Sequence, residues 1–308
     1  MGHKKNPSRS LVLQAKDALQ SQLSIGRSKR GDKRQMGVDG LRGHIYTGET
    51  YRSYLNNCCK FVKWAKRNHP SIKTIEDCKP YVEEWLQHKN WSASTQKTYL
   101  AALAKMYGVS ALTFNVNTGK RRRSDITRSR KNAVRDDRFK EYNHSDFVEF
   151  CRSTGLRNNK ELSRVRGSDL FVHENQHFVH VKGKGGKLRD VPVVGDVELV
   201  RRLCEAAGDD KVFPSIPSAA DVHSFRADYC RRVYDMYARP IEQLRGVREW
   251  YGKRNPKTGE KIMESAIYRM RCDRAGEEYD RAAMQQASRA LGHEQVSVIA
   301  SNYLYHRD

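Results

Sequence analysis

Residues 177–194 read HFVHVKGKGGKLRDVPVV, in which two short runs rich in Val flank a segment of glycine and lysine. Runs of this composition are typical of β-strands, and neighbouring glycines permit the tight turn that joins two antiparallel strands. We therefore expect a hairpin with strands at 177–181 and 190–194, closed by residues 182–187.

The segments on both sides of this hairpin carry helical patterns. Apolar residues recur at helical spacing in 144–153, around Arg226 and in 282–290. A hairpin placed among such helices predicts a mixed, mainly α domain with a small antiparallel sheet, and we assign residues 139–308 to it.

The first part of the chain is predicted to be entirely helical. Apolar residues share one helical face in 11–23, 76–88 and 92–107, and Thr47 is a suitable N-cap for a further helix. The basic, glycine-containing stretch at 26–43 is expected to separate the first two helices. We assign residues 1–118 to this domain, so the whole chain is expected to be a multidomain α and β protein.

Residues 119–138 join the two predicted domains and contain almost no apolar side chains. Their cations suit either a solvated spacer or a strand that crosses the DNA backbone, because phosphate contacts depend on charge. The predicted DNA-contacting residues of this linker are Lys120, Arg121, Arg122, Arg123, Arg128, Arg130 and Lys131.

The chain is strongly basic, because 58 Lys and Arg residues stand against 36 Asp and Glu residues, for a formal net charge of +22. This excess favours a polyanionic partner, and nucleic acid is the leading candidate. No apolar stretch approaches the roughly 20 residues that span a bilayer. The N-terminal residues lack the apolar core of a signal peptide. We therefore expect a cytoplasmic, nucleoid-associated protein without a membrane partner.

Seven cysteines are scattered without any C-x-x-C pair, which argues against a zinc site or a disulfide framework. Most of them lie among apolar residues, so we expect reduced thiols in the cores and no bound metal. The glycine-rich segment at 183–187 lacks the G-x-x-x-x-G-K-[ST] pattern of a phosphate-binding loop and is expected to join two strands. The sequence therefore does not indicate an NTPase.

Five short blocks follow one another in the second half of the chain. They are Thr154-Gly155-Leu156-Arg157 with Glu161, the hairpin block at 182–193, His223-Ser224-Phe225-Arg226, Leu291-Gly292-His293 and Asn302-Tyr303. Each block alone is a weak signal, but in this order they resemble the tyrosine recombinase (phage integrase) family over about residues 140–306. The helical first part resembles, more weakly, the core-binding (SAM-like) DNA-binding domain of that family.

The resemblance implies an active site of six residues. They are Arg157, Lys184, His223, Arg226, His293 and Tyr303. Arg157 and Arg226 would bind the non-bridging oxygens of the scissile phosphate, because guanidinium groups match that geometry and keep their charge. His223 would accept or relay the proton of the nucleophile, and His293 would donate a hydrogen bond to the phosphate.

Two of these assignments have a rival close by. Lys184 would protonate the leaving 5′ oxygen, and we prefer it to Lys187 because it lies at the expected tip of the hairpin. Tyr303 would attack phosphorus and form a 3′-phosphotyrosyl linkage, and we prefer it to Tyr305 because its sequence context matches the family. Glu161 would support the site, or alternatively pair with a neighbouring arginine. The covalent linkage stores the bond energy, so the resemblance implies no metal, ATP or other cofactor.

The spacing of two pairs departs from the family pattern. Glu161 follows Arg157, and Tyr303 follows His293, at one residue more than is usual. Each extra residue puts the local geometry of the pair in question, but not the identity of its members.

A third departure is an insertion between the last two helical blocks. Arg226 and His293 are 67 positions apart, which implies an insertion over about residues 239–281. Within it we expect a basic, turn-rich loop at 251–259 and a β-hairpin at 266–280. Integrases of conjugative and mobilizable elements carry similar β-insertions, so the resemblance favours that subclass.

The motifs and the resemblance together predict a site-specific DNA recombinase that cleaves and rejoins double-stranded attachment sites, integrating or excising a mobile element. It would act as a homotetramer on DNA and associate weakly without it. A type IB topoisomerase-like enzyme shares the chemistry, and a DNA-binding regulator on a recombinase scaffold shares the fold. The hairpin block and the basic helical domain favour a recombinase over the topoisomerase, and the joint presence of six catalytic residues argues against the regulator.

Overall fold

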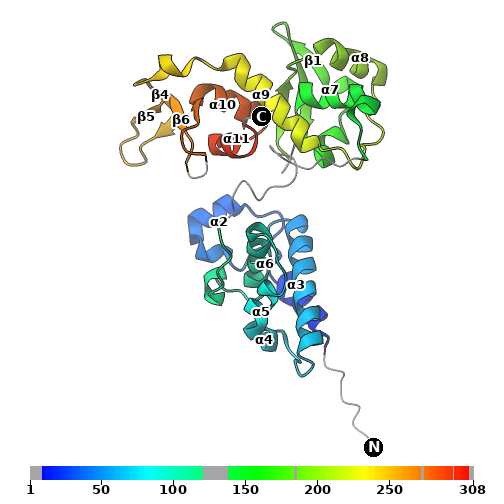
Figure 1. The fold of residues 1–308 in the computed structure, drawn as a ribbon, viewed down its shortest axis with the longest axis vertical. Coiled ribbons are helices and arrows are strands. Elements are labelled where there is room, and N and C mark those ends of the chain that lie inside the picture. Colours follow the sequence, from blue (N-terminus) through cyan, green and yellow to red (C-terminus); the bar gives the residue numbers. More distant parts are fainter. Residues whose placement is uncertain (1–8, 121–137, 184–185, 272–273, 294, 305–308) are drawn as a thin grey trace, which may run out of the picture. The chain divides into compact units, whose positions relative to one another are not determined.

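The computed structural model describes residues 9–120, 138–183, 186–271, 274–293 and 295–304, drawn as ribbons in Figure 1. The chain divides into two compact units, residues 1–125 and 126–308. Of the seven predicted linker contacts to DNA, Lys120 is described and exposed, and the other six lie outside the described residues. The predicted bounds of the linker and of the two domains therefore stay a prediction.

The first unit is built of helices, as predicted. Its α-helices are α1 (Leu11–Gln20), α2 (Lys29–Met36), α3 (Gly48–Asn68), α4 (Ile75–Cys78), α5 (Val82–Gln87) and α6 (Ala93–Met106), and its 3₁₀ turns are η1 (Asp39–Leu41), η2 (Lys79–Tyr81) and η3 (Ala111–Phe114). Helix α3 begins after the predicted N-cap Thr47, whose hydroxyl accepts a hydrogen bond from the Thr50 amide at 3.2 Å. In the described part of the chain, no helix combines the length and the apolar character needed to cross a membrane.

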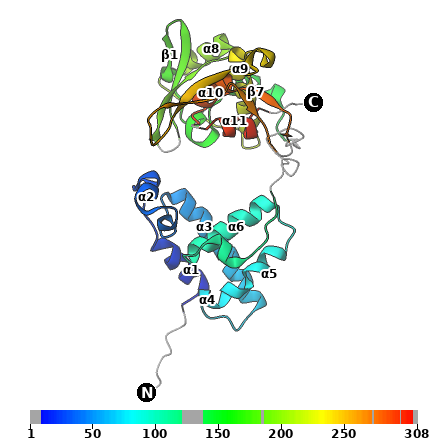
Figure 2. The ribbon, with the colours of Figure 1, turned by 90° about the vertical axis from the view of Figure 1, so that its left-hand side faces the viewer.

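The core of the first unit forms where α3 packs against α1 and α6 (Figure 2). Leu19, Phe61 and Leu103 are fully buried there. The ring of Phe61 lies 5.2 Å from the ring of Trp85, centroid to centroid. The Cys58 thiol belongs to the same core, and burial raises its pKa. All six cysteines that the structure describes are free thiols, as predicted.

Two parts of this unit differ from the sequence prediction. The stretch at 26–43 contains α2 and η1, and Ser28 caps α2 by accepting a hydrogen bond from the Gly31 amide at 3.1 Å. The predicted helix at 76–88 is divided into α4, η2 and α5. Pro80 lies in η2, and a proline has no amide proton to donate to the preceding turn.

The second unit is mixed and mainly helical, which confirms the predicted fold class. Its α-helices are α7 (Ser145–Thr154), α8 (Val197–Ala207), α9 (Val222–Tyr237), α10 (Arg281–Ala290) and α11 (Val296–Asn302); its short turns are η5 (Glu141–His144), η6 (Asn158–Leu162), η7 (Gly167–Asp169) and η9 (Ile241–Leu244). Its strands are β1 (Leu170–His173), β2 (Gln176–Lys182), β3 (Leu188–Pro192), β4 (Arg248–Arg254), β5 (Lys261–Ser265), β6 (Ile267–Arg269) and β7 (Glu278–Asp280). Helix α9 packs against α7 on one side and α10 on the other, so it joins the two halves of the unit (Figure 1).

The three-stranded antiparallel sheet has the order β1-β2-β3. Strands β2 and β3 are the predicted hairpin. Strand β1 is not predicted from the sequence; it is four residues long and turns into β2 through Glu174 and Asn175, both at positive φ. Asn is common in that conformation but Glu is not, so the turn lacks a clear signal in the sequence.

The insertion between α9 and α10 contains two antiparallel strand pairs. Strand β6 pairs with β7, which confirms the predicted hairpin at 266–280. The predicted loop at 251–259 is wrong in part, because its first residues belong to β4, which pairs with β5. The turn begins at Asn255, whose amide donates to the Glu260 carbonyl at 2.9 Å. Charged side chains interrupt the apolar alternation of β4, so its pattern does not indicate a strand.

The end of α7 turns the chain toward the site at Gly155, which has a φ of 57°. A Cβ at this position would lie 2.2 Å from the fully buried ring of Tyr229. Glycine therefore meets two requirements here, a left-handed backbone and the close approach of an aromatic ring.

Gly155→Ala is expected to lower the free energy of unfolding by about 3 kcal/mol, because it adds both backbone strain and overpacking. Gly246 is the matched control, since its φ is 76° but a Cβ there would meet nothing within 4 Å. Gly246→Ala should lose only the backbone contribution, about 1 kcal/mol. Urea unfolding measures both variants, and equal losses would contradict the packing argument.

Candidate active site

The site is organised around the carboxylate of Glu161, whose side chain is fully buried. One carboxylate oxygen accepts from the Arg157 guanidinium at 2.7 Å, and the other accepts from the Arg157 amide at 2.8 Å and the Arg189 guanidinium at 2.7 Å. Burial raises the pKa of Glu161, but Arg189 and the two donors of Arg157 outweigh it and hold the pKa below its usual value. The carboxylate therefore stays charged and orients both guanidinium groups.

A π-helical turn accommodates the extra residue between Arg157 and Glu161. In η6 the Leu162 amide donates at 2.9 Å to the carbonyl of Arg157, five residues back. Such a turn holds one residue more than an α-helical turn. The unusual spacing in the sequence therefore leaves the contact between the two side chains intact.

Arg226 lies on α9 and is only 2% exposed. Its Nε donates to the Tyr303 hydroxyl at 3.3 Å, and its terminal nitrogens donate to the carbonyls of Gly155 and Leu291. The Leu291 carbonyl also accepts from Arg157, at 3.0 Å. The same carbonyl thus accepts hydrogen bonds from both arginines that are predicted to bind phosphate.

The block Leu291-Gly292-His293 forms a Schellman motif at the end of α10. The His293 amide donates to the Ser288 carbonyl at 2.8 Å, and the Gly292 amide donates to the carbonyl three residues back, also at 2.8 Å. Gly292 has a φ of 67°, and a Cβ there would lie 2.9 Å from the side chain of Arg189. The glycine therefore lets the helix end beside Arg189 and places His293 at the site.

Tyr303 follows α11 and is 4% exposed. Its hydroxyl lies 3.2 Å from Nε2 of His293 and 3.3 Å from Nε of Arg226. Its ring centroid lies 5.2 Å from that of His223 and 5.5 Å from that of His293. The structure thus brings the predicted nucleophile together with three of the predicted catalytic side chains. Tyr305 lies outside the described residues.

The environment of His293 favours its neutral form. Burial, followed by the cations of Arg226 and other nearby arginines, lowers its pKa from 6.5 to about 4. The guanidinium of Arg226 can only donate to the Tyr303 hydroxyl, so that hydroxyl is left to donate its own proton. In the tautomer that carries its hydrogen on Nδ1, His293 accepts that proton at Nε2. His293 is therefore a candidate proton acceptor in addition to the predicted His223.

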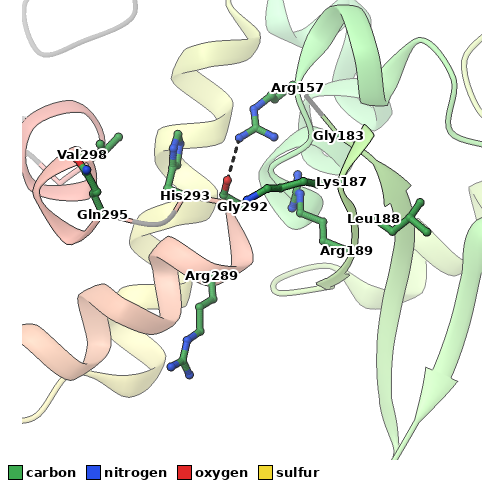
Figure 3. Close-up of a pocket in the computed structure, with 10 residues that line it drawn as sticks. All are labelled: Arg157, Gly183, Lys187, Leu188, Arg189, Arg289, Gly292, His293, Gln295 and Val298. Atoms are coloured by element: carbon green, nitrogen blue, oxygen red, sulfur yellow. Dashed lines mark hydrogen bonds between the residues drawn. The ribbon is translucent and has the colours of Figure 1, made fainter. Parts of the chain in front are cut away.

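A cavity of about 660 Å³ opens beside these residues (Figure 3). Its lining residues are Arg157, Gly183, Lys187, Leu188, Arg189, Arg289, Gly292, His293, Gln295 and Val298. In Figure 3, Arg157 and Lys187 extend toward the turn that holds Gly292, whereas Arg289 points away from it. The cations around the cavity suit a phosphate group. Among the residues that the structure describes, no three His, Cys, Asp or Glu side chains gather as metal ligands would.

Arg189 is a residue of this site that was not predicted from the sequence. It joins β3 to Glu161 and donates to the Ala290 carbonyl at 2.5 Å, and burial lowers its pKa to about 10. Its only sign in the sequence is its place in the hairpin block at the start of β3. The predicted general acid Lys184 lies outside the described residues, whereas its rival Lys187 lines the cavity.

The arrangement has the components of nucleophilic attack on a phosphodiester. A phenol hydroxyl lies next to a neutral imidazole that can take its proton, and fixed guanidinium groups surround both. Guanidinium groups held in this way favour the negative charge that develops on a phosphate during attack.

Comparison with known proteins gives one family match and several similar structures. Residues 36–108 match the family model of the phage integrase N-terminal SAM-like domain. One similar solved structure is XerH site-specific recombinase bound to palindromic difH substrate in a post-cleavage complex, with 13% identity, 98% of this chain and 95% of that chain covered, and a TM-score of 0.48. Another is a pre-cleavage complex of XerH with difH substrate, with 13% identity, coverage of 100% and 95%, and a TM-score of 0.47. No curated protein matches the chain.

Glu161→Gln is expected to destabilise the protein by about 3 kcal/mol, because it leaves the guanidinium groups of Arg157 and Arg189, whose side chains are 27% and 13% exposed, without their buried counter-charge. Glu198→Gln is the matched control, since Glu198 pairs with Arg201 at the surface and its side chain is 73% exposed. Loss of that surface pair should not measurably change stability. Urea unfolding compares the two, and losses of similar size would show that burial of Glu161 is not the cause.

His293 should make the protein less stable as the pH falls. The unfolded chain takes up this proton near pH 6.5, whereas the folded state resists it down to about 4. The stability that depends on neutral His293 is therefore complete above pH 6.5 and is lost as the pH falls through about 4. His293→Gln removes this loss. As the pH falls from 6.5 to about 4, the free energy of unfolding of the variant, measured with urea, should therefore decrease less than that of the wild type.

His173→Gln is the control for this pH dependence, because the His173 side chain is 68% exposed. Its free energy of unfolding should change with pH as that of the wild type does. If the free energies of unfolding of the wild type and His293→Gln change with pH in parallel, the pKa of His293 is not lowered in the folded state.

Proposed function

We propose that this chain, a member of the tyrosine recombinase (phage integrase) family, cuts and rejoins double-stranded DNA at specific sites through Tyr303. The observation that carries the proposal is the hydrogen bonding of the Tyr303 hydroxyl to Arg226 and His293 beside a cationic cavity. A hydroxyl held between a guanidinium and a neutral imidazole is suited to activation as a nucleophile.

In the proposed cleavage step, the Tyr303 oxygen attacks phosphorus and the bond between phosphorus and the 5′ oxygen breaks. The phenol proton passes to His293 or His223, and the phosphate remains on the 3′ end as a phosphotyrosine. Arg157 and Arg226 would stabilise the negative charge of the transition state. Because the new ester keeps the energy of the broken bond, the 5′ hydroxyl of another strand can reverse the step and rejoin the DNA.

The leaving 5′ oxygen also needs a proton donor. We propose Lys184 for this role, with Lys187 as the alternative, since an ammonium group on a flexible stem can follow the oxygen as it leaves. The position of Lys187 in the lining of the cavity, together with Arg157, supports this alternative.

DNA binding must replace some contacts that are present in the site. The terminal nitrogens of Arg226 donate to the carbonyls of Gly155 and Leu291, and Tyr303 is only 4% exposed. A phosphate oxygen accepts a stronger, charge-assisted hydrogen bond from guanidinium than a carbonyl does. The scissile phosphate would therefore compete for these donors when DNA enters the cavity.

We further propose that the enzyme integrates or excises a mobile element and assembles as a homotetramer on its attachment sites. The net charge of +22 supports a DNA partner, and the β-insertion between α9 and α10 supports the mobile-element subclass.

Tyr303→Phe should abolish the covalent protein–DNA adduct, with a loss of cleavage rate on the order of 10⁴-fold or more, because it removes the attacking oxygen. The substrate is DNA from the ends of the element that encodes the chain, nicked near the cleavage position to trap the adduct. Denaturing gel electrophoresis detects the adduct. Tyr305→Phe is the matched control and should still form it.

Two outcomes would change the proposal. An adduct that persists in Tyr303→Phe and disappears in Tyr305→Phe would move the nucleophile. Metal-free relaxation of a supercoiled plasmid without attachment sites, at the rate seen with them, would favour the topoisomerase-like enzyme.

A further inference from the structure

The β6–β7 hairpin of the insertion leads directly into the elements that carry His293 and Tyr303. Strand β7 ends at Asp280, and α10 begins at the next residue and ends in the turn that places His293. Helix α11 then leads to Tyr303. Tyr279 of β7 is buried in the core of the second unit. The hairpin is therefore part of the packing of this unit and not a surface attachment.

Arg274 lies between β6 and β7, and its side chain is only 7% exposed. Its guanidinium donates to the carbonyl of Ala300 and, at 2.7 Å, to the carbonyl of Leu304. These two carbonyls lie on either side of Tyr303 in the sequence. A buried cation from the insertion thus contacts the backbone that carries the proposed nucleophile.

The contact occurs where α11 ends and its last carbonyls lack helical partners. In a continuing helix the Leu304 amide would reach the Ala300 carbonyl, but here it donates to the Ile299 carbonyl at 3.0 Å. A cation at this end also suits the negative end of the helix dipole. Arg274 therefore caps the C-terminus of α11 from another part of the chain.

The hairpin itself orients the Arg274 guanidinium. Nε donates to the Glu277 carboxylate at 2.6 Å, and Nη2 donates to the Tyr279 hydroxyl at 2.6 Å. The Tyr279 hydroxyl in turn donates to Glu277 at 2.6 Å. Because the guanidinium fork is planar and rigid, these contacts fix the direction in which its remaining donors meet α11.

We propose that Arg274 is a positioning residue for the nucleophile, which fixes the end of α11 and so holds the Tyr303 hydroxyl beside Arg226 and His293. The inference rests on the proposed role of Tyr303 and gives the insertion a function within its own chain. The size of the effect follows from geometry, because a displacement of about 1 Å from the attack position lowers a rate by on the order of 100-fold.

Arg274→Ala should lower the rate of adduct formation on nicked DNA by on the order of 100-fold. Its affinity for DNA, measured by gel shift, should stay at the wild-type value, because the buried side chain does not face solvent. Hydrogen exchange of the backbone amides should become faster in 299–304 and stay unchanged in the β4–β5 pair. Arg274→Lys keeps a cation that can reach one carbonyl, so it should recover part of the rate.

Arg269→Ala is the matched control, since Arg269 lies in β6, pairs with Glu278 at 2.8 Å and is 65% exposed. It should leave both the adduct rate and the exchange of 299–304 at wild-type values. A wild-type adduct rate in Arg274→Ala, or an equal loss in Arg269→Ala, would overturn the inference.

Tyr279→Phe tests the same point if Arg274→Ala does not fold, because it removes one hydroxyl that orients the guanidinium. We expect a smaller loss of rate, on the order of tenfold, together with faster exchange in 299–304. A wild-type rate and exchange in this variant would overturn the inference. Failure of the proposed function has a separate signature, since Tyr303→Phe would then still form the adduct.

Discussion

The buried carboxylate of Glu161 is the constraint on which the candidate active site depends. The guanidinium groups that lie around it are those of Arg157, Arg189 and Arg226. Repulsion among these cations would open such a site unless an anion offset it. Glu161 supplies that anion, and by binding both Arg157 and Arg189 it joins the turn after α7 to strand β3.

Main-chain carbonyls, in addition to this carboxylate, accept hydrogen bonds from the guanidinium groups of the site. The Leu291 carbonyl accepts from both Arg157 and Arg226, and Arg274 makes the same kind of contact with the carbonyls at the end of α11. Arginine suits these places because its planar fork donates to several acceptors at once and keeps its charge when buried. Guanidinium–carbonyl contacts from distant segments thus surround Tyr303 and set the geometry in which it would attack.

The predictions from sequence held where a feature depends on neighbouring residues and missed where it depends on distant ones. The Thr47 cap and the β2–β3 hairpin were predictable because each is local. Arg189 was not, because its partners Glu161 and Ala290 lie 28 and 101 positions away. Strand β1 was missed because its turn into β2 places Glu174 at a positive φ, which a glutamate side chain does not favour and which the sequence therefore does not signal.

By itself the sequence determined the helical and hairpin segments, the strong positive charge and the order of motifs that indicates the family. Apolar spacing, net charge and short motifs are properties of residues close together in the chain. Only the tertiary structure decided which side chains meet, such as Arg189 with Glu161, and His293 with the Tyr303 hydroxyl. Hydrogen bonds act over about 3 Å, so partners that are distant in sequence can be recognised only after folding has brought them into contact.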